Sequence, residues 1–364
     1  MNLTKKFLGT VLTVAAVGMM GCPPKTTEED VVSNKLSMEA GTAKIDGKEV
    51  AYDMKSGKDC FKLYFSDDFN YTSKEQLFSA PLPGDIDISK DTIDKKTKNA
   101  WFGQLTWNNT PDAIEVKDGA LELYVKRVDP ETYPTPDGAQ TGTGQDEDWH
   151  LICDSICGGV TFNKEIKYGY LEAKIMMPEK KYSEYWPGFY TEGYTTTTED
   201  GEKKATAGYE FDIFEPMGTS KIDQPTHWRA LQPGDRLNTL QKQSPLEFNK
   251  WITASVAWTP DKVAYYLDGQ LSYVIYNDNH NGALTETAVK KITESSKATV
   301  AKKNNYQIVA NVPQEVILVV AIGKGFGAIT GATLPTISSQ EPGTSALVYK
   351  YDSFKYYEYV GTED

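Results

Sequence analysis

The sequence lacks any unbroken apolar run of about eighteen residues, the minimum for a helix that spans a bilayer permanently. It also lacks an excess of positive charge, since 38 Lys and Arg stand against 51 Asp and Glu, a formal net charge of −13. Nucleic-acid binding needs a basic face for the phosphates, so we exclude this class of partner. The same charge argues, less strongly, against a polyanionic substrate.

Cysteine is scarce, with four residues in the whole chain. If Cys22 is modified, Cys60, Cys153 and Cys157 remain, which allows one disulfide and one free thiol in an exported protein. On one strand, the Cα atoms of Cys153 and Cys157 would lie roughly 13 Å apart, too far to bridge. The spacing from His150 to these two cysteines also permits a zinc site with Cys60 as fourth ligand. We favour free or disulfide-paired cysteines.

The N-terminus has the pattern of an export signal. Lys5 and Lys6 precede a short apolar run, residues 7–20, which ends in Gly21-Cys22. This ending resembles the lipobox of bacterial lipoproteins, in which the cysteine is lipidated and becomes the mature N-terminus. Two methionines at positions 19 and 20 depart from that pattern, and ordinary secretion is the alternative. We therefore expect residues 1–22 to be a signal peptide with a lipobox.

After this signal, residues 23–36 are polar and begin with two prolines, which is typical of a flexible tether. We expect residues 37–364 to form one folded domain, with a core from about residue 62 to 360. A lipid on Cys22 would hold this domain at the membrane of a bacterial cell envelope, on the periplasmic or the outer-surface face.

Alternating apolar and polar residues dominate the rest of the chain, and turn residues separate the segments. Many short strands at regular spacing predict an all-β sandwich or jelly roll of two antiparallel sheets. Only Thr285–Lys303 has a helical pattern, and Pro134–Asp148 is expected to be a loop. The predicted strand segments are Ala113–Arg127 with a turn at Asp118-Gly119, Tyr168–Pro178, Ile252–Tyr276 with two turns, Glu315–Gly323 and Ala346–Val360.

The segment GYEFDIFEPMG, residues 208–218, crowds three carboxylates into an apolar strand. On a regular strand Glu210 and Asp212 share one face, but Glu215 would point to the apolar face with Phe211. Burying an isolated carboxylate among apolar side chains is costly. One extra residue, a β-bulge near Phe214, would return Glu215 to the face of the other two acids.

Three carboxylates on one face repel one another, so at least one should hold a proton at neutral pH. A retaining glycosidase needs this combination of an ionised nucleophile and a protonated acid, with the carboxyl groups about 5–5.5 Å apart. The alternative for this segment is a solvated acidic strand edge.

Further segments share a family resemblance with this motif. Glu210-x-Asp212-x-x-Glu215 is similar to the signature of glycoside hydrolase family 16 in its bulged, laminarinase-like form. The chain also resembles the family, in family order, from about residue 62 to 360. The supporting segments are FSDDFN, VKDGALEL, YGYLEAKIMMP, WPGF, His227-Trp228, AWTPDKVAYYLDGQ, VILVVAIGKGFG and the final strand.

The resemblance implies a jelly roll whose concave face is the substrate cleft. It implies that Glu210 is the nucleophile, that Glu215 is the acid and base, and that Asp212 lies between them. It implies no cofactor for catalysis, and we expect a polysaccharide substrate and a monomer. The substrate-binding candidates are Trp186, Phe189, Tyr190, His227, Trp228 and Arg229, although Arg229 could instead pair with the cleft acids.

Family members often bind a structural Ca²⁺ on the convex side through the opening and last strands. Asp68 and Asp352 are the candidates for this site here. The sequence departs from the family at Gly188, at Tyr190 and at Phe326, and the insertion Thr195–Ala207 is expected to lengthen a loop beside the cleft. These departures affect the sugar specificity more than the chemistry.

The leading functional hypothesis is an endo-acting retaining hydrolase of a β-1,3- or mixed β-1,3/1,4-glucan. One alternative is hydrolysis of a marine galactan such as agar, porphyran or carrageenan. Another is a transglycosylase, which differs only in the acceptor that outcompetes water. The third is a carbohydrate-binding surface protein without catalysis, which the presence of all three acids disfavours.

Overall fold

The computed structural model describes residues 36–84, 97–103, 110–129, 155–182, 185–199, 202–216, 221–230, 238–276, 299–302, 309–322 and 334–364. The predicted signal peptide, Cys22, nearly all of the tether and the predicted loop 134–148 lie outside these residues, as do His150 and Cys153. In the described ranges, no helix has the length and apolar character needed to cross a membrane.

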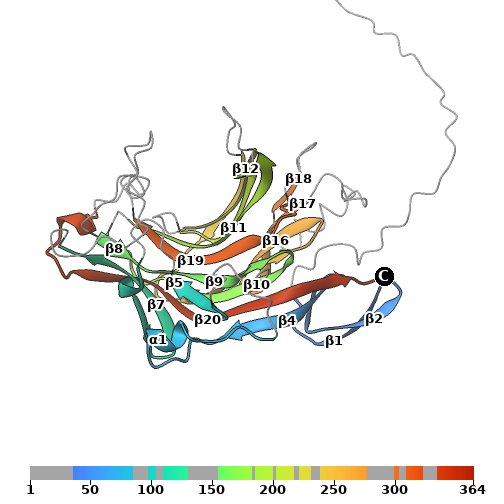
Figure 1. Ribbon diagram of the computed structural model, residues 1–364, viewed down its shortest axis with the longest axis horizontal. Coiled ribbons are helices and arrows are strands. Elements are labelled where there is room, and N and C mark those ends of the chain that lie inside the picture. The colour runs from blue at the N-terminus through green and yellow to red at the C-terminus, as the bar shows by residue number, and fades with distance from the viewer. Residues whose placement is uncertain are drawn as a thin grey trace, which may run out of the picture.

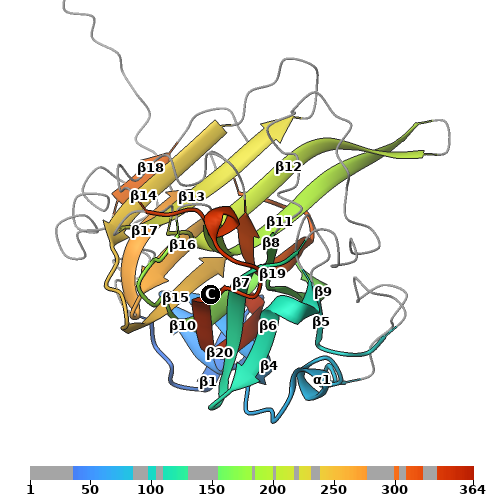
Figure 2. The same cartoon turned by 90° about the vertical axis from the view of Figure 1, so that its left-hand side faces the viewer.

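The described chain is almost entirely β-structure in two large sheets, with a small third sheet at one edge (Figures 1 and 2). The eleven-stranded sheet, here the large sheet, contains β3 (Met54–Ser56), β4 (Asp59–Asp67), β6 (Ile114–Lys117), β7 (Ala120–Arg127), β8 (Ser155–Cys157), β10 (Gly169–Met176), β15 (Trp251–Trp258), β16 (Lys262–Leu267), β17 (Gln270–Tyr276), β18 (Thr299–Lys302) and β20 (Ser345–Thr362).

The seven-stranded sheet is here named the cleft sheet, because it carries the residues predicted to line the cleft, and its strands β11 and β12 curl upward in Figure 1. Its strands, in spatial order, are β14 (Asn238–Pro245), β13 (Lys221–Ala230), β12 (Glu202–Phe214), β11 (Tyr185–Glu199), β19 (Gln314–Ile322), β9 (Gly159–Ile166) and β5 (Trp101–Gly103). The third sheet pairs β1 (Gly41–Ile45) with β2 (Lys48–Tyr52). Within the described ranges, the helical elements are α1 (Lys74–Leu77) and two 3₁₀ turns, Pro111–Ala113 and Ile337–Ser339.

The strand pattern of the sequence is confirmed in most places. β6 and β7 form the hairpin predicted at Asp118-Gly119, and these two residues have φ of 52° and 73°. Such positive φ angles are what a two-residue hairpin turn of type I′ requires. The three strands predicted within 252–276 are β15, β16 and β17. The apolar run in β19 is buried from Val316 to Val320, as expected of a strand covered on both faces.

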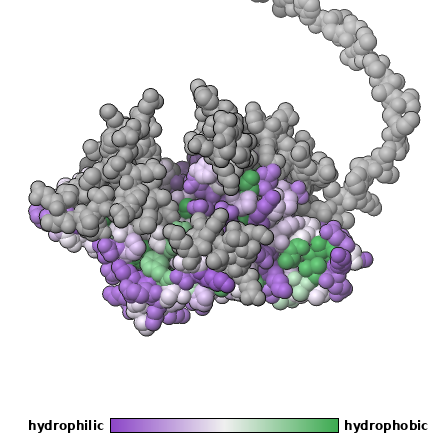
Figure 3. Space-filling model, viewed as in Figure 1, coloured by the Kyte–Doolittle hydropathy of each residue, from purple (hydrophilic) through white to green (hydrophobic). Residues whose placement is uncertain are grey.

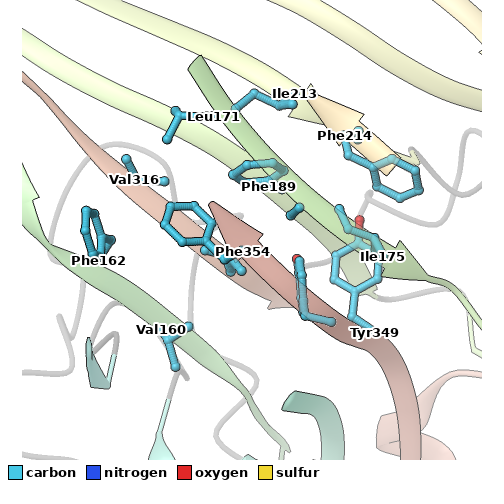
Figure 4. Packing of buried hydrophobic residues seen from close by; sticks show 14 of the residues in the cluster. Val160, Phe162, Leu171, Ile175, Phe189, Ile213, Phe214, Val316, Tyr349 and Phe354 are labelled. Atoms are coloured by element: carbon cyan, nitrogen blue, oxygen red, sulfur yellow. The ribbon is translucent and has the colours of Figure 1, made fainter. Parts of the chain in front are cut away.

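The main hydrophobic core lies between the two large sheets. Figure 4 shows its centre, where Phe189, Ile213 and Phe214 of the cleft sheet lie close to Ile175 and Phe354 of the large sheet. All five side chains are fully buried. The described outer surface in Figure 3 is mainly hydrophilic, in keeping with the strongly acidic composition.

Two predicted elements are wrong in part. The helix predicted over 285–303 is contradicted at residues 299–302, which form β18 and pair in parallel with β17. The insertion at 195–207 is not a loop, because its two halves continue β11 and β12 as paired strands up to Glu199 and from Glu202. The four consecutive threonines at residues 195–198 favour a strand, and the adjoining pairs extend an existing hairpin.

The two described cysteines, Cys60 and Cys157, are free thiols and both are buried. They belong to different hydrophobic clusters, Cys60 beside β1 and Cys157 in the main core. Burial raises the pKa of the Cys60 thiol to about 11. A disulfide or zinc site that joins these two residues is therefore excluded, and whatever involves Cys153 lies outside the described residues.

Candidate active site

The predicted β-bulge is present in β12, at Ile213. Opposite β11, Asp212 pairs with Tyr190 and Phe214 pairs with Phe189, so Ile213 has no counterpart. The extra residue lets both Ile213 and Phe214 enter the core, as Figure 4 shows. Because the alternation is reset at this point, Glu215 returns to the face that carries Asp212. One irregularity in a strand thus brings the three acids together.

Glu215 is held in a strongly acidic environment. Its pKa is raised well above the ordinary value, first by burial and then by the nearby charges of Asp212, Glu210 and Asp223. The Trp186 indole donates a hydrogen bond to the Glu215 carboxyl, which acts in the opposite direction. The backbones of Glu215 and Asp223 exchange two hydrogen bonds, of 3.1 and 2.9 Å. Glu215 therefore carries a proton well above the pH at which a free glutamic acid loses it.

Asp212 and His227 form the second part of the site. Burial, followed by the charges of Glu210 and Glu192, raises the pKa of Asp212 well above its ordinary value. Burial lowers the pKa of His227, although Glu210 opposes this shift. The His227 Nε2 and Asp212 Oδ2 atoms are 3.3 Å apart. Both shifts favour neutral forms, so we interpret this contact as a neutral acid beside a neutral imidazole and not as an ion pair.

The cross-strand register aligns a row of acids that was not predicted from the sequence. Glu210 pairs with Glu192 on β11, and Glu192 pairs with Glu315 on β19. The other neighbour of Glu210 is His227 on β13. Burial and these carboxylates raise the pKa of the Tyr190 hydroxyl, so Tyr190 lies among them. We call Glu192, Glu210 and Glu315 the acidic row.

The predicted substrate-binding residues divide between the two faces of the cleft sheet. Trp186 and Tyr190 lie on the acid-bearing face, because one contacts Glu215 and the other lies among Asp212, Glu192 and Glu210. The assignment of Phe189 to the cleft is wrong. Its side chain is fully buried in the core, and its ring centroid is 6.4 Å from that of Phe354.

The remaining candidates lie at the end of β13. His227 faces the acids, whereas Trp228 and Arg229 pair with Tyr209 and Gly208 of β12. The side chains of Trp228 and Arg229 are outside the described part of the structure. Their roles therefore stay predictions.

Two places bear on metal binding. In the described ranges, one group of three ligand-type side chains comes close enough for a cation: Glu210, Asp212 and His227, whose ligand atoms all lie within 4.8 Å of one another. Metal ligands must be deprotonated, and the raised pKa of Asp212 works against that. The predicted calcium ligand Asp352 instead accepts a hydrogen bond from the Lys174 ammonium at 2.8 Å, a cation that would repel Ca²⁺. Asp68 is exposed, and the calcium site stays a prediction.

Comparison with known proteins gives one match to a family and several to structures. The model for glycosyl hydrolases family 16 matches residues 103–307, more than half of the chain. A search of curated proteins found no significant match.

Three of the similar solved structures illustrate the range. A Z. galactanivorans protein solved with laminaritriose and laminaritetraose is 19% identical, with 81% of this chain and 98% of that chain covered and a TM-score of 0.48. A structure reported for the endo-acting O-glycanases with which human gut microbiota initiate mucin breakdown is 16% identical, with coverage of 83% and 92% and a TM-score of 0.49. The catalytic domain of an endo-1,3-β-glucanase (laminarinase) from Thermotoga petrophila is 18% identical, with coverage of 83% and 99% and a TM-score of 0.46.

Proposed function

The chain belongs to family 16 of the glycosyl hydrolases, and on that premise we propose that it cleaves internal bonds of a β-1,3- or mixed β-1,3/1,4-glucan with retention of configuration. The observation that carries this proposal is the bulge at Ile213, which gathers Glu210, Asp212 and Glu215 on one face. The bulged spacing of these acids also resembles that of laminarinases.

In the first half of the proposed reaction, the Glu210 carboxylate attacks the anomeric carbon while Glu215 gives its proton to the departing glycosidic oxygen. The raised pKa of Glu215 suits this role, because a general acid must still hold its proton at the working pH. The bond from the anomeric carbon to the leaving oxygen breaks as the bond to the Glu210 oxygen forms. The product is a covalent glycosyl-enzyme.

In the second half, the ester at Glu210 carries no charge, so one of the groups that raised the pKa of Glu215 is gone. Glu215 then loses its proton more readily and can accept one from water. Water attacks the anomeric carbon and Glu210 leaves with its electron pair. Neutral Asp212, beside His227, can donate a hydrogen bond to the nucleophile in either half.

The acidic row supports a neutral polysaccharide over a sulfated one. Carboxylates accept hydrogen bonds from sugar hydroxyls, but they repel sulfate esters. Glu192 lies next to Glu210 in the register, so a sulfate near the scissile bond would meet several negative groups. Among the alternatives, an unsulfated galactan would satisfy this environment as well as a glucan, and a transglycosylase would share the first half-reaction.

The test is the stereochemistry of the first product on a panel of laminarin, lichenan, agarose and carrageenan. Proton NMR before mutarotation should show the β-anomer from a β-linked glucan. Release of the α-anomer first would mean inversion and would overturn the roles of Glu210 and Glu215. Cleavage of carrageenan in preference to the glucans would overturn the substrate class and leave the chemistry intact.

We also propose that a lipid on Cys22 anchors the protein at a bacterial membrane, on the strength of the N-terminal pattern. The full chain should partition into the detergent phase in a Triton X-114 separation, and Cys22→Ser should move it to the aqueous phase. Equal partitioning of the two forms would mean ordinary secretion.

A further inference from the structure

The bulge at Ile213 interrupts the regular pairing of β12 with its neighbours, so a backbone group there needs a hydrogen-bond partner from elsewhere. Between the pair Phe211–Thr226 and the bridge Glu215–Asp223, β12 has three residues where β13 has two. The extra residue of a bulge is left out of the ladder of hydrogen bonds. Opposite β11 the unmatched residue is Ile213, and Ile213 is also one of the three residues that stand opposite two on β13. Its carbonyl therefore needs a partner from outside the ladder, because a buried unpaired carbonyl is costly.

Gln224 supplies the partner. Its side-chain amide Nε2 donates a hydrogen bond of 3.2 Å to the Ile213 carbonyl oxygen, in a fully buried position. The next residue along β13 is Pro225, which has no backbone N–H to offer. The Gln224 side chain thus provides a hydrogen-bond donor beside Pro225, a residue whose backbone provides none.

The Gln224 side chain is in turn held by the opposite sheet. Ser272 on β17 donates a hydrogen bond of 2.7 Å to the Gln224 Oε1 atom. This contact fixes which end of the amide faces Ile213. It also connects the bulge to a strand of the large sheet, so the position of the bulge is set from both layers of the sandwich.

From these contacts we infer that Gln224 is a positioning residue, which holds the bulge and thereby keeps Glu215 on the face of Glu210 and Asp212. Gln224 does not itself reach the cleft, since Ile222 and Thr226, at the same alternation, face the core. Without a stable bulge, regular alternation would turn Glu215 toward the core. A buried glutamine is costly unless hydrogen-bonded, and here both of its polar atoms are used. This inference rests on the proposed function for its catalytic readout.

The experiment compares three variants with the wild type on laminarin. Gln224→Met keeps the length of the side chain and removes the donor. Ser272→Ala removes the support of Gln224. Ser56→Ala is the matched control, because Ser56 also makes one buried hydrogen bond, of 2.6 Å to the Tyr266 hydroxyl, and Tyr266 belongs to a hydrophobic cluster separate from the core between the two sheets.

Gln224→Met should lower kcat by about 10- to 100-fold, as expected when a catalytic group is displaced by a fraction of an ångström to an ångström. KM should change by less than about threefold, because the substrate-binding surface is intact. Ser272→Ala should cost about two- to tenfold in kcat, and the double variant should be no worse than Gln224→Met, since Ser272 acts through Gln224. Ser56→Ala should leave kcat unchanged per folded molecule.

The pH profile separates positioning from plain stability. If Glu215 leaves its place beside Asp212, Glu210 and Asp223, both its burial and these neighbouring charges change, and the basic limb of kcat/KM should shift away from its wild-type pH. An unmoved limb together with wild-type kcat in Gln224→Met would overturn the inference. If Gln224→Met does not fold, a Ser272→Ala variant that is indistinguishable from Ser56→Ala overturns it equally.

A failure of the proposed function would have a different signature. If the wild type cleaves none of the polysaccharides, the carboxyl carbon of Glu215 can still be titrated by ¹³C NMR in the intact protein. A midpoint that shifts in Gln224→Met but not in Ser56→Ala would uphold the positioning role without any activity. An identical midpoint in all forms would sink it.

Discussion

The large sheet and the cleft sheet differ in the partners of their buried carboxyl groups. In the large sheet, Glu122 is 3% exposed, and its carboxylate receives the Lys350 ammonium at 2.6 Å and the Tyr124 hydroxyl at 2.5 Å. Asp59 is paired with Lys262 at 2.5 Å in the same sheet. In the cleft sheet, the charged groups that act most on the buried carboxyls are other carboxylates.

The difference separates a sheet whose buried carboxylates have lysine partners from a sheet whose buried carboxyls lie beside other carboxylates. When a buried carboxylate has a lysine partner, removal of either group leaves the other buried without compensation, which strongly destabilises the fold. Asp212 and Glu215 instead keep protons that free side chains would lose, and they do so at a cost in stability at neutral pH. Raised pKa values in a cleft are typical of catalytic sites.

The largest expected effect is on the chemistry of the cleft sheet. Glu210→Gln should reduce kcat by about a thousandfold or more, ~4 kcal/mol of barrier, because it removes the nucleophile of the covalent mechanism that we propose. The change is nearly isosteric, so thermal stability and oligosaccharide binding by calorimetry should stay close to wild type. Activity within tenfold of wild type would remove Glu210 from the mechanism.

A comparable loss in the large sheet should appear in stability alone. Lys350→Met leaves Glu122 buried without its lysine and should lower the free energy of unfolding by about 2–4 kcal/mol. The lower half of this range is favoured, since the Lys350 side chain is 21% exposed. Urea denaturation measures the loss, and Glu122→Gln in the same background should restore part of it. A change in kcat per folded molecule would contradict the division of labour between the sheets.

A stabilising substitution is expected in the cleft sheet. Because the folded-state pKa of Asp212 is raised, its contribution to stability is fully present below the unfolded pKa of about 4 and is lost as pH rises toward the folded value. Asp212→Asn, which cannot ionise, should therefore raise stability by about 0.5–2 kcal/mol at pH 7 relative to wild type. The gain should shrink at pH 4. Melting curves of the variant and the wild type at the two pH values measure this gain. An equal gain in stability at pH 7 and pH 4 would show that the ionisation of Asp212 is not the cause.

The smallest effect concerns specificity. Glu192→Gln removes one charge from the acidic row and should weaken binding of a neutral oligosaccharide by less than about 1 kcal/mol, a fewfold rise in KM. It should improve the ratio of activity on sulfated to neutral polymer, because one repulsive group is gone. As a control, Glu115→Gln changes an exposed carboxylate in the large sheet that pairs with Lys126 at 3.3 Å. If Glu192→Gln and this control behave alike, the acidic row does not select the substrate.

Alternation along a single strand let several features be predicted. It identified β10, β15, β16, β17 and β20, and the conflict between Glu215 and Phe211 required the bulge that is found at Ile213. The same alternation also places Phe189 and Tyr190 on opposite faces of β11. The error at Phe189 arose because the segment WPGF was read as one cleft floor instead of residue by residue.

Other features depend on which strands become neighbours, and the sequence by itself determined none of them. Glu192 and Glu315 join Glu210 only through the register of β19, β11 and β12, and Asp223 reaches Glu215 only through a bridge to β13. Local patterns fix which face of its own strand a side chain occupies, because that depends on a period of two residues. Pairing and register decide which side chains meet across strands, since they depend on the packing of the whole sandwich. The motif therefore determined the three acids, and only the tertiary structure decided what surrounds and supports them.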